Sequence, residues 1–424
     1  MFEKIVKRVR WTWRSLIVRS GFPGVLDRRT FRRAFAASPS SETGHVLLIA
    51  PGAGNVGDQA MFEAFLERTT GRVTVVAHRS ADVSVPAEHS DRVAIELLPA
   101  LVYGSGRSHR DDVAGLARLL SKASSFSIVG ADIMDGRYVL RASVRRSVLA
   151  GAAAAAQVPT RILGFSWNGN ARPAARKQLV AATRAGVVPL LRDPLSLRRA
   201  EQHGVARAVP VADIVFSATS IDRSWGARYA SDKPLALVNV SGLISRDVDQ
   251  SVEYVEIVEH LLSIGYAVLL LPHVSRPDAD DVVSCVAIQQ RVGADRVALA
   301  PELPTPAQVR GLTEVADIVI TGRMHLAIMG LWSNTPAITL ATQGKVEGLM
   351  ELIGAPELCV EPTRGFGAEV VERLSTILPG DSPTRVAITE ARPRLEALSL
   401  VNTQGLSEGV NPRSVSLLAD APAG

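Results

Sequence analysis

Short apolar runs of strand length alternate with longer amphipathic or alanine-rich segments from about residue 45 onward. Continuous apolar runs are typical of strands buried on both faces, and helices of this length cover the faces of a parallel sheet. The alternation stops in a polar stretch without a clear period at 217–233 and then starts again. The sequence therefore predicts an α/β fold in which two Rossmann-like parallel-sheet domains face each other across a cleft. Ligands of such sheets bind at the carboxyl ends of the strands.

The predicted elements form two series, one on each side of the polar stretch. The expected strands are 45–50, 72–77, 93–98, 126–129, 161–166, 187–191 and 208–211, then 235–240, 267–271, 297–300, 318–321 and 337–340. The expected helices are 61–68, 113–122, 139–157, 173–185 and 194–203, then 252–263, 280–292, 306–315, 324–332, 345–353 and 385–399. We expect four segments: a basic amphipathic segment 1–40, domains at 41–225 and 226–380, and a last helix with a loose tail at 381–424.

The charge of the chain is concentrated near its start. Residues 1–33 hold ten Lys and Arg against two acidic side chains, which is +8; because the net charge of the 424 residues is +5, the remainder carries −3. A nucleic-acid-binding protein usually spreads basic residues over a folded face with interleaved aromatics or a recognition helix, and the body of this chain has neither pattern. We therefore expect no nucleic acid partner.

The basic start of the chain also contains apolar and aromatic residues, among them Trp11 and Trp13. This mixture predicts either an interfacial helix on an anionic membrane surface or a solvated basic helix packed on the body. No apolar run reaches the length of a transmembrane helix, and no apolar signal region ends in a cleavage site. The two cysteines, Cys285 and Cys359, are too few for a disulfide framework. A cytoplasmic location, with possible peripheral attachment to the inner face of the plasma membrane, is the expectation.

A glycine-rich loop follows the first predicted strand. Gly52, Gly54 and Gly57 have the spacing of a dinucleotide-binding fingerprint, and an arginine after the second strand would suit NADP rather than NAD. Against this interpretation, Asp58 would place a carboxylate where the pyrophosphate has to lie. The plainer alternative is a βα turn in which Asp58 caps the helix. The lysine of a phosphate-binding P-loop is absent.

A second cluster lies at the start of a buried helix in the other half. Arg323 and His325 follow the predicted strand 318–321 and precede an apolar stretch. A helix N-terminus favours anions, and a guanidinium matches a carboxylate or phosphate, so we expect a small anionic group to bind here. His325 is then a candidate proton donor, although a histidine at a helix start is also a common cap or packing residue. Lys345 and His273 follow other strands of the same sheet and add two further basic side chains to its carboxyl edge.

The first half contributes Arg192 and Asp193 at a strand-to-helix junction, followed by Asp213 at the end of the next strand. Such an Arg–Asp pair is commonly a salt bridge or a cap, but its place at the carboxyl edge favours a role in the cleft.

Together these motifs resemble the polysaccharide pyruvyl transferase family over roughly residues 45–355. The motifs that carry the resemblance are Gly54-Asn55-Val56-Gly57-Asp58, Arg192-Asp193-Pro194-Leu195-Ser196 followed by Asp213, and Arg323-Met324-His325 followed by Pro336 and Lys345. The resemblance implies a fold similar to two-domain GT-B glycosyltransferases, with an acceptor-side first domain and a donor-side second domain. It also implies transfer of a pyruvyl group from phosphoenolpyruvate to two hydroxyls of a sugar in a surface polysaccharide or lipid-linked oligosaccharide.

The resemblance assigns roles to individual positions. The family's donor-binding arginine and histidine fall on Arg323 and His325, its first-half arginine on Arg192, and its polar first-loop pair on Asn55 and Asp58. The chain departs from the family at 129–135, where Val-Gly-Ala-Asp-Ile-Met-Asp replaces a frequent run of glycines. A divergent acceptor or a loss of activity therefore stays open.

A reaction of this kind needs counter-charges, an acid and a base. Arg192, Arg323 and Lys345 supply positive charge, His325 is the expected acid, and Asp58 is a candidate base or hydroxyl anchor. We expect no metal, because no ligand spacing is present, and no cofactor. Two rival interpretations stay open. One is a nucleotide-sugar glycosyltransferase on the same architecture, with Glu347 as ribose anchor; the other is a non-catalytic relative in polysaccharide export.

Overall fold

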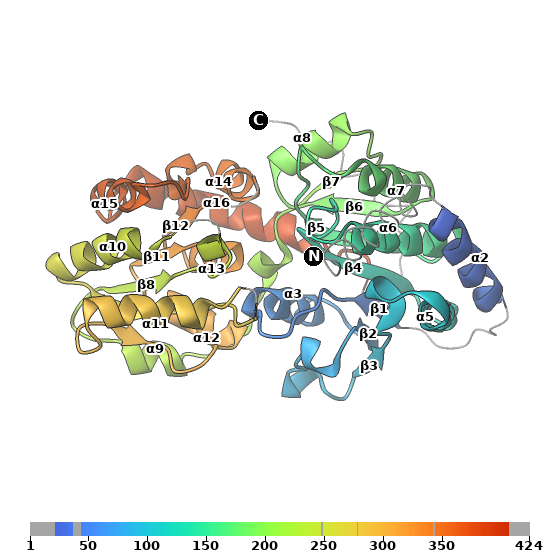
Figure 1. Cartoon of the computed structure of the whole chain (residues 1–424), viewed down its shortest axis with the longest axis horizontal. Coiled ribbons are helices and arrows are strands. Elements are labelled where there is room, and N and C mark those ends of the chain that lie inside the picture. Colours follow the sequence, from blue (N-terminus) through green and yellow to red (C-terminus); the bar gives the residue numbers. More distant parts are fainter. Residues whose placement is uncertain (1–21, 37–43, 247–248, 278, 342–343, 407–424) are drawn as a thin grey trace, which may run out of the picture.

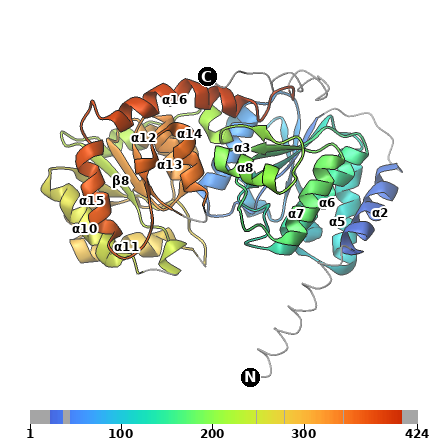
Figure 2. The same cartoon turned by 90° about the horizontal axis from the view of Figure 1, so that it is seen from above.

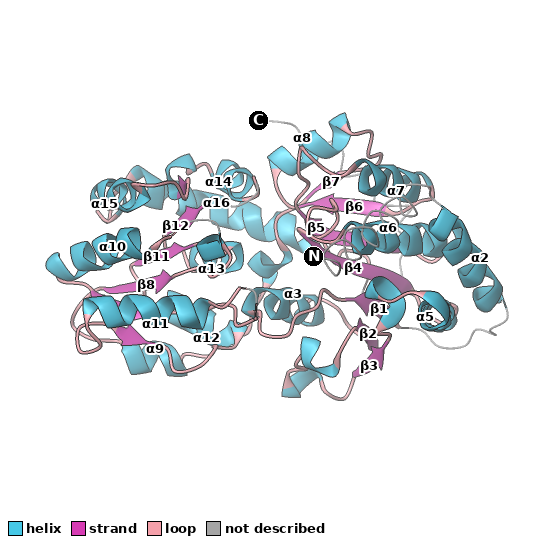
Figure 3. Ribbon diagram, viewed as in Figure 1, coloured by secondary structure: helices cyan, strands magenta, loops and turns pink. Residues whose placement is uncertain are grey.

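The computed structural model describes residues 22–36, 44–246, 249–277, 279–341 and 344–406. Two α/β lobes lie side by side, each a parallel sheet between layers of helices (Figure 1). In both lobes the strands (magenta) form an inner layer that the helices (cyan) cover (Figure 3). The predicted fold class is confirmed.

The first lobe is built on a seven-stranded sheet in the order β3-β2-β1-β4-β5-β6-β7, in which every pair is parallel. Its order reverses between β1 and β4, which creates a crevice where their loops part. The strands are β1 (His45–Leu48), β2 (Val73–Ala77), β3 (Val93–Leu97), β4 (Ser125–Ala131), β5 (Thr160–Phe165), β6 (Val188–Leu191) and β7 (Val209–Pro210). The helices are α2 (Phe22–Ala36), α3 (Val56–Glu67), α4 (Ala100–Tyr103), α5 (Gly106–Leu120), α6 (Leu140–Ala155), α7 (Pro173–Arg184) and α8 (Pro194–Gln202).

The second lobe repeats this plan with a six-stranded sheet in the order β10-β9-β8-β11-β12-β13, again parallel. Its reversal lies between β8 and β11. The strands are β8 (Leu235–Asn239), β9 (Ala267–Leu270), β10 (Ala298–Leu299), β11 (Ile318–Thr321), β12 (Ala337–Leu340) and β13 (Cys359–Val360). The helices are α9 (Ser224–Tyr229), α10 (Ser251–Ser263), α11 (Asp281–Val292), α12 (Pro306–Thr313), α13 (Met324–Trp332), α14 (Val346–Ile353), α15 (Phe366–Ile377) and α16 (Pro383–Leu400).

Single-turn 3-10 helices occupy several connections. They are η1 (Ser80–Asp82), η2 (Ala87–His89), η3 (Ile214–Ser217), η4 (Ile244–Arg246) and η5 (Pro356–Leu358). The stretch 217–233, expected to be a linker, contains the end of η3 and the whole of α9. The last helix is longer than expected, whereas β13 and α15 were not predicted at all.

Helix α3 is part of the core of both lobes. Its apolar residues belong to one cluster of buried side chains that includes most of the second lobe's interior, among them Met61, Phe62 and Phe65, each at most 1% exposed. The helix lies at the junction between the lobes (Figure 1). The two domains are thus joined through a shared core, which fixes the N-terminus of α3 relative to α13.

Helix α16 crosses from the second lobe back to the first (Figure 2). Asn402, which follows it, is fully buried and binds the first sheet's loops: its Oδ1 accepts from Gly164 N at 2.8 Å, and its Nδ2 donates to Ala212 O at 2.9 Å. Ser399 Oγ donates to Asp213 O at 2.8 Å. The chain therefore ties both domains together a second time, beside a candidate site residue.

Helix α2 packs on the outside of the first lobe against α5 and α6 (Figure 2). Phe31 is 1% exposed, and Asp27 is buried 3.0 Å from His109 Nε2. The expected basic N-terminal segment 1–40 is therefore helical and docked over 22–36. Residues 1–21 and 37–40 lie outside the described residues, and so does the expected tail at 407–424.

Candidate active site

The predicted site residues gather where the two sheets face each other. Loops after β1, β4, β6 and β7 meet loops after β9, β11 and β12, all at carboxyl ends of parallel strands. Both topological reversal points contribute, which is where open α/β sheets bind ligands. The site therefore lies at the interface of the lobes.

His325 is one of the residues through which the second lobe contacts the first. It lies in the first turn of α13, and its Nε2 is 3.6 Å from Oδ2 of Asp213, which belongs to the other lobe. The same oxygen accepts a hydrogen bond from Arg192 Nη1 at 2.7 Å, and Arg192 Nε donates to Ser166 Oγ at 2.9 Å. Arg192 is only 2% exposed. The carboxylate is thus shared between a buried guanidinium and an imidazole.

This arrangement sets the charge of Asp213. Burial alone would raise its pKa, but the nearby imidazole of His325 and the charge of Arg192 hold the pKa well below its ordinary value. Asp213 is therefore an anion that faces the ring of His325.

The start of α3 holds the second polar group. Asn55 caps the helix, with its Oδ1 accepting from Gly57 N at 3.0 Å, and its Nδ2 donates to Asp58 Oδ2 at 2.8 Å. Arg276 Nη2, from the second lobe, donates to the same carboxylate oxygen at 3.1 Å. Burial raises the pKa of Asp58 above its ordinary value, and the charges of Arg276 and His325 offset part of this effect. A carboxyl with a raised pKa suits a base that works near neutrality.

The glycines of the first loop are required by contacts between parts of the protein. Gly54 has a φ of 68°, and a Cβ on it would lie 2.1 Å from Ser275 O. A Cβ on Gly57 would lie 2.4 Å from Nδ1 of His325, and one on Gly52 would lie 2.3 Å from Asp82 O. The space that a pyrophosphate takes in a dinucleotide-binding loop is therefore filled by the second lobe and by the loop after β2.

Lys345 binds across the interface of the lobes to the loop after β4. Its Nζ lies 2.6 Å from Asp132 Oδ2, which also accepts a hydrogen bond from Tyr138 Oη at 3.0 Å. Burial would raise the pKa of Asp132, but Lys345 and Arg192 hold it below its ordinary value. The glycine-poor segment 129–135 therefore supplies a charged group that bridges the domains.

Arg323 is engaged by a carboxylate from its own lobe. Its Nε and Nη2 form a bidentate pair with Asp281, the shortest distance being 2.6 Å, and the side chain is 13% exposed. For Nη1 no hydrogen-bond partner is found within the described ranges. The guanidinium is therefore held rigidly, with one nitrogen left for a ligand.

His273 is buried next to this pair. It is 1% exposed, and neither ring nitrogen has a partner among the described residues. Burial, together with the charges of His325 and Arg323, lowers its pKa well below the ordinary value. His273 is therefore a neutral imidazole, so the expectation that it adds to the anion-binding edge as a positive charge is wrong.

The structure thus brings all the predicted site residues to one interface and adds others that sequence reasoning missed. The additions are Arg276, Asp281, Asp132, Tyr138 and Ser166. Arg276 was within reach of sequence reasoning, because it follows the strand end at His273 by three residues. Asp281 stands at a helix start, where an acidic residue looks like an ordinary cap.

Within the described part of the chain, no group of three or more His, Cys, Asp or Glu side chains is arranged to hold a metal ion. None of the described helices is long and apolar enough to cross a membrane.

The family profile described as "Polysaccharide pyruvyl transferase" matches residues 55–344, more than half of the chain. The chain belongs to this family. The matched region begins at Asn55 and includes His325, so both sides of the interface site lie inside the family's domain.

Solved structures share the fold of this pyruvyl transferase family member at low identity. They include S. aureus MnaA in complex with UDP (TM-score 0.57, 12% identity, covering 90% of this chain and 99% of that one). UDP-GlcNAc 2-epimerase from Neisseria meningitidis is similar (TM-score 0.55, 10% identity, 85% and 98%). A glycosyltransferase from Rickettsia africae also matches (TM-score 0.53, 12% identity, 89% and 100%). No curated protein matches the chain in sequence. These similarities show a GT-B-like fold.

Proposed function

We propose that this family member transfers the pyruvyl group of phosphoenolpyruvate to two hydroxyls of a sugar, forming a ketal. The observation that carries the proposal is the approach of His325 to Asp213 across the lobes, near Asp58; Arg192 holds Asp213 in place. An acid and a base from opposite domains suit a reaction between two substrates held in a cleft. Membership of the family supports a transferase that acts on polysaccharide.

The reaction adds two sugar hydroxyls to one carbon of phosphoenolpyruvate and releases phosphate from the same carbon. A proton adds to the methylene carbon of the enol, the first sugar hydroxyl attacks the resulting cationic carbon, the C–O bond to phosphate breaks, and the second hydroxyl closes the ring. The two hydroxyl protons are balanced by one on the new methyl group and one on the phosphate released. Neither an oxidant nor a reductant takes part.

We assign each residue of the candidate site a separate role in this reaction. His325 donates the proton to the methylene carbon, and the carboxylate of Asp213 faces its ring. Asp58 accepts a hydroxyl proton, because its raised pKa brings it nearer to neutrality. Arg192 is a positioning residue, since it acts through Asp213 from a buried place. Arg323 Nη1, Lys345 and the unpartnered ring of His273 form the donor side.

The test is phosphate release from phosphoenolpyruvate in the presence of a sugar acceptor, measured with donor binding on the same variants. We expect His325→Ala to lower turnover at least 100-fold while donor affinity changes little, because general-acid help is felt in the transition state. Arg323→Ala should instead weaken donor binding at least tenfold. Loss of binding without loss of turnover in His325→Ala would make it an anion ligand, and unaltered kinetics in both variants would refute the proposed site.

A nucleotide-sugar glycosyltransferase is the second candidate, favoured by one observation. Oε2 of Glu347, in the first turn of α14, is buried without a hydrogen-bond partner among the described residues. A ribose diol would satisfy such a carboxylate. A thermal-shift comparison of phosphoenolpyruvate, UDP-sugars and NADPH separates the candidates, because a ligand that binds only the folded state raises the melting temperature. Stabilisation by a UDP-sugar that Glu347→Gln abolishes would favour this alternative.

We also propose peripheral attachment to an anionic membrane at the cytoplasmic side, through the face formed by α2 and α7. The exposed charged side chains of these helices are all basic, and Val25 and Leu26 on α2 are 54% and 42% exposed. The one acidic residue of α2, Asp27, is buried, and α7 has none. Arg28 Nη1 joins the two helices by donating to Gln178 Oε1 at 3.5 Å. Such a face suits lipid-linked acceptors.

A further inference from the structure

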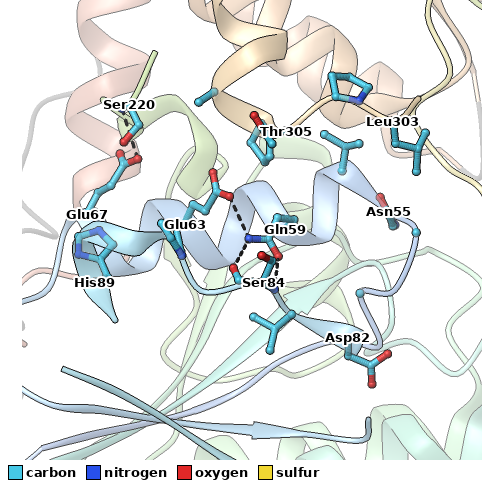
Figure 4. A pocket seen from close by; sticks show the side chains of 18 of the residues that line it. Asn55, Gln59, Glu63, Glu67, Asp82, Ser84, His89, Ser220, Leu303 and Thr305 are labelled. Carbon is cyan, nitrogen blue, oxygen red and sulfur yellow. Dashed lines mark hydrogen bonds between the residues drawn. The ribbon is translucent and has the colours of Figure 1, made fainter. Parts of the chain in front are cut away.

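A cavity of about 560 Å³ runs along α3, on the opposite side of this helix from His325. Gln59, Glu63 and Glu67 line it at a spacing of four residues, which places them on one face of the helix (Figure 4). Gly57, which contacts His325, precedes Gln59 by two positions, or about 200° around the helix. The cavity is therefore separate from the proposed reacting centre, although Gly54 and Asn55 belong to both.

The cavity has two walls of different character. Its upper wall comes from the second lobe and contains Leu303, Thr305 and two prolines, while its lower wall is the loop after β2 with Ser84 (Figure 4). The polar part is rich in carboxylates: Glu63, Glu67, Asp82 and Glu88. No lysine or arginine is found among the described residues that line it.

Glu63 has an oxygen available to a ligand. The residue is 8% exposed; its Oε1 accepts from Gln59 Nε2 at 2.9 Å, but Oε2 has no hydrogen-bond partner within the described residues. Behind it, Nη1 and Nη2 of fully buried Arg310 have no hydrogen-bond partner among the described residues, although Nη2 forms long ion pairs with Glu63 Oε2 at 4.0 Å and Glu67 Oε1 at 3.8 Å. Unpaired polar atoms at a cavity wall are costly, and a ligand that donates hydrogen bonds would satisfy the carboxylate.

The chemistry of this wall selects the ligand. Ionised carboxylates only accept hydrogen bonds, whereas Glu63, whose pKa burial raises to about 7, can also donate one when protonated. Such a wall favours hydroxyl and ammonium groups and repels phosphates and carboxylates. A pyranose ring presents hydroxyls at its edge and C–H groups on its faces, which match the acidic wall and the leucine–proline wall respectively. Phosphoenolpyruvate and UDP are poor ligands for it.

We propose that this cavity is a second carbohydrate subsite, which binds an uncharged or amino sugar unit of the acceptor at a distance from the unit that receives the pyruvyl group. The inference rests on the proposed function, because only a polymeric or oligosaccharide acceptor has such a unit. Asn55, at the rim, links the subsite to Asp58 through its side-chain amide.

The experiment uses the full-length protein and methyl glycosides of glucose, galactose and mannose, their 2-amino forms, and the matching methyl uronides. Binding is followed by saturation-transfer NMR at millimolar sugar. Ser84→Trp fills the cavity while keeping the backbone bonds of Ser84 to Gln59. Ala87→Trp, exposed on the same loop but outside the cavity, is the matched control. Glu88→Lys removes one exposed acidic group and needs no space in the interior.

We expect at least one neutral or amino glycoside to bind, with at least tenfold loss in Ser84→Trp and unchanged binding in Ala87→Trp. Glu88→Lys should weaken amino sugars at least threefold more than neutral ones, and the uronides should not compete. Absence of binding by every neutral and amino glycoside, retention of binding in Ser84→Trp, or equal binding of uronides would overturn the proposal. Phosphoenolpyruvate binding is measured on the same samples: its absence in the unaltered protein refutes the proposed function, whereas its retention in Ser84→Trp alongside lost sugar binding supports the separate subsite.

Discussion

The ring of His325 lies between two neighbours from the first lobe. Asp213 lies at its Nε2 side, and the backbone of Gly57 lies against the rest of the ring, where a Cβ would come within 2.4 Å of Nδ1. The imidazole is thus held between a carboxylate of one loop and the first turn of α3. Its position depends on a residue that carries no side chain.

This contact leads to a prediction for Gly57→Ala. The added methyl group has to displace the imidazole, and a shift of about 1 Å in a reacting group costs about 100-fold in rate. We expect turnover to fall by about that factor while the fold and donor binding persist. Gly380→Ala is the control, because a Cβ there meets nothing within 4 Å. The measurement is phosphate release together with thermal unfolding, and full activity in Gly57→Ala would contradict the assigned position of His325.

Glu63 leads to a prediction about stability and pH. Burial raises its pKa to about 7, since the hydrogen bond from Gln59 and the charge of Arg310 offset the burial only in part, and Glu67 and Glu88 add repulsion. The folded state therefore binds more protons than the unfolded state between about pH 4.5 and 7, so the free energy of unfolding falls as pH rises through this window. The full shift corresponds to about 3 kcal/mol.

Glu63→Gln removes this titration and keeps the shape of the side chain. We expect the variant to be more stable than the parent protein at pH 8 and to lose that advantage at pH 5. Urea unfolding at both pH values measures the difference. A constant difference across the two pH values would mean that Glu63 is ionised in the fold at pH 5 already.

Several site residues were predictable because they follow strands directly, whereas their partners were not. Arg192 and Asp213 stand at the ends of β6 and β7, and parallel sheets put such residues at one edge. Asp281 and Asp132 bind Arg323 and Lys345 through contacts that the local sequence pattern does not encode. Ion pairs between distant segments have no periodicity, so only the folded arrangement reveals them.

At the scale of elements, strands were predicted better than helix starts. The expected strand 318–321 has the same bounds as β11, because a buried run of β-branched residues has clear limits. Helix α3 begins at Val56 rather than at 61, since the glycines made its first turn look like a loop. β13 has only two residues, and its pattern is too short to detect. The largest errors therefore occurred where glycine residues, or the shortness of an element, hide the hydrophobic periodicity of the sequence.

The end of α16 and the residues after it, 399–404, tie the second lobe to the first; this segment, the strap, leads to a prediction at the scale of elements. Asn402→Ala leaves Gly164 N and Ala212 O without partners in a fully buried place, which costs about 1 to 3 kcal/mol for each group. We expect a clearly lower melting temperature and reduced turnover, because Asp213 adjoins the freed carbonyl. Gln404→Ala, with an exposed side chain two residues later, serves as the control. Equal melting temperatures for the two variants would show that the strap does not hold the lobes.

At the scale of the whole molecule, the two domains share a hydrophobic core, the strap after α16 and the candidate site. α3 packs into the interior of the second lobe, and α16 returns to the first (Figure 2). The proposed active centre and the proposed sugar subsite lie on opposite sides of α3, so an oligosaccharide that reaches both has to pass the N-terminus of this helix. The basic face of α2 and α7 lies on the outer side of the first lobe, away from the second lobe (Figure 2). A membrane-bound orientation would thus leave the cleft between the lobes accessible.

The basic side chains of α2 lead to a prediction about binding to anionic membranes. Reversing the charge of Arg29, Arg32 and Arg33 on α2 should release the protein from anionic vesicles, because each cation near the surface contributes about 1 kcal/mol. The same change at three exposed arginines of the second lobe, Arg228, Arg291 and Arg364, should not. High salt should mimic the first variant, since charges are screened within about 8 Å at physiological ionic strength.

Deletion tests the part of the chain that precedes α2. The cut belongs before Phe22, because removing residues 1–33 would also remove Phe31 from the core. We expect deletion of residues 1–21 to weaken vesicle binding and activity on a lipid-linked acceptor, while activity on a soluble analogue persists, because docking on lipid contributes nothing to the chemical step itself. Co-sedimentation with anionic and neutral vesicles at low and high salt decides the matter. Equal binding to both vesicle types, or binding to neither, would mean that α2 is a structural helix and that the charge at the start of the chain has no membrane role.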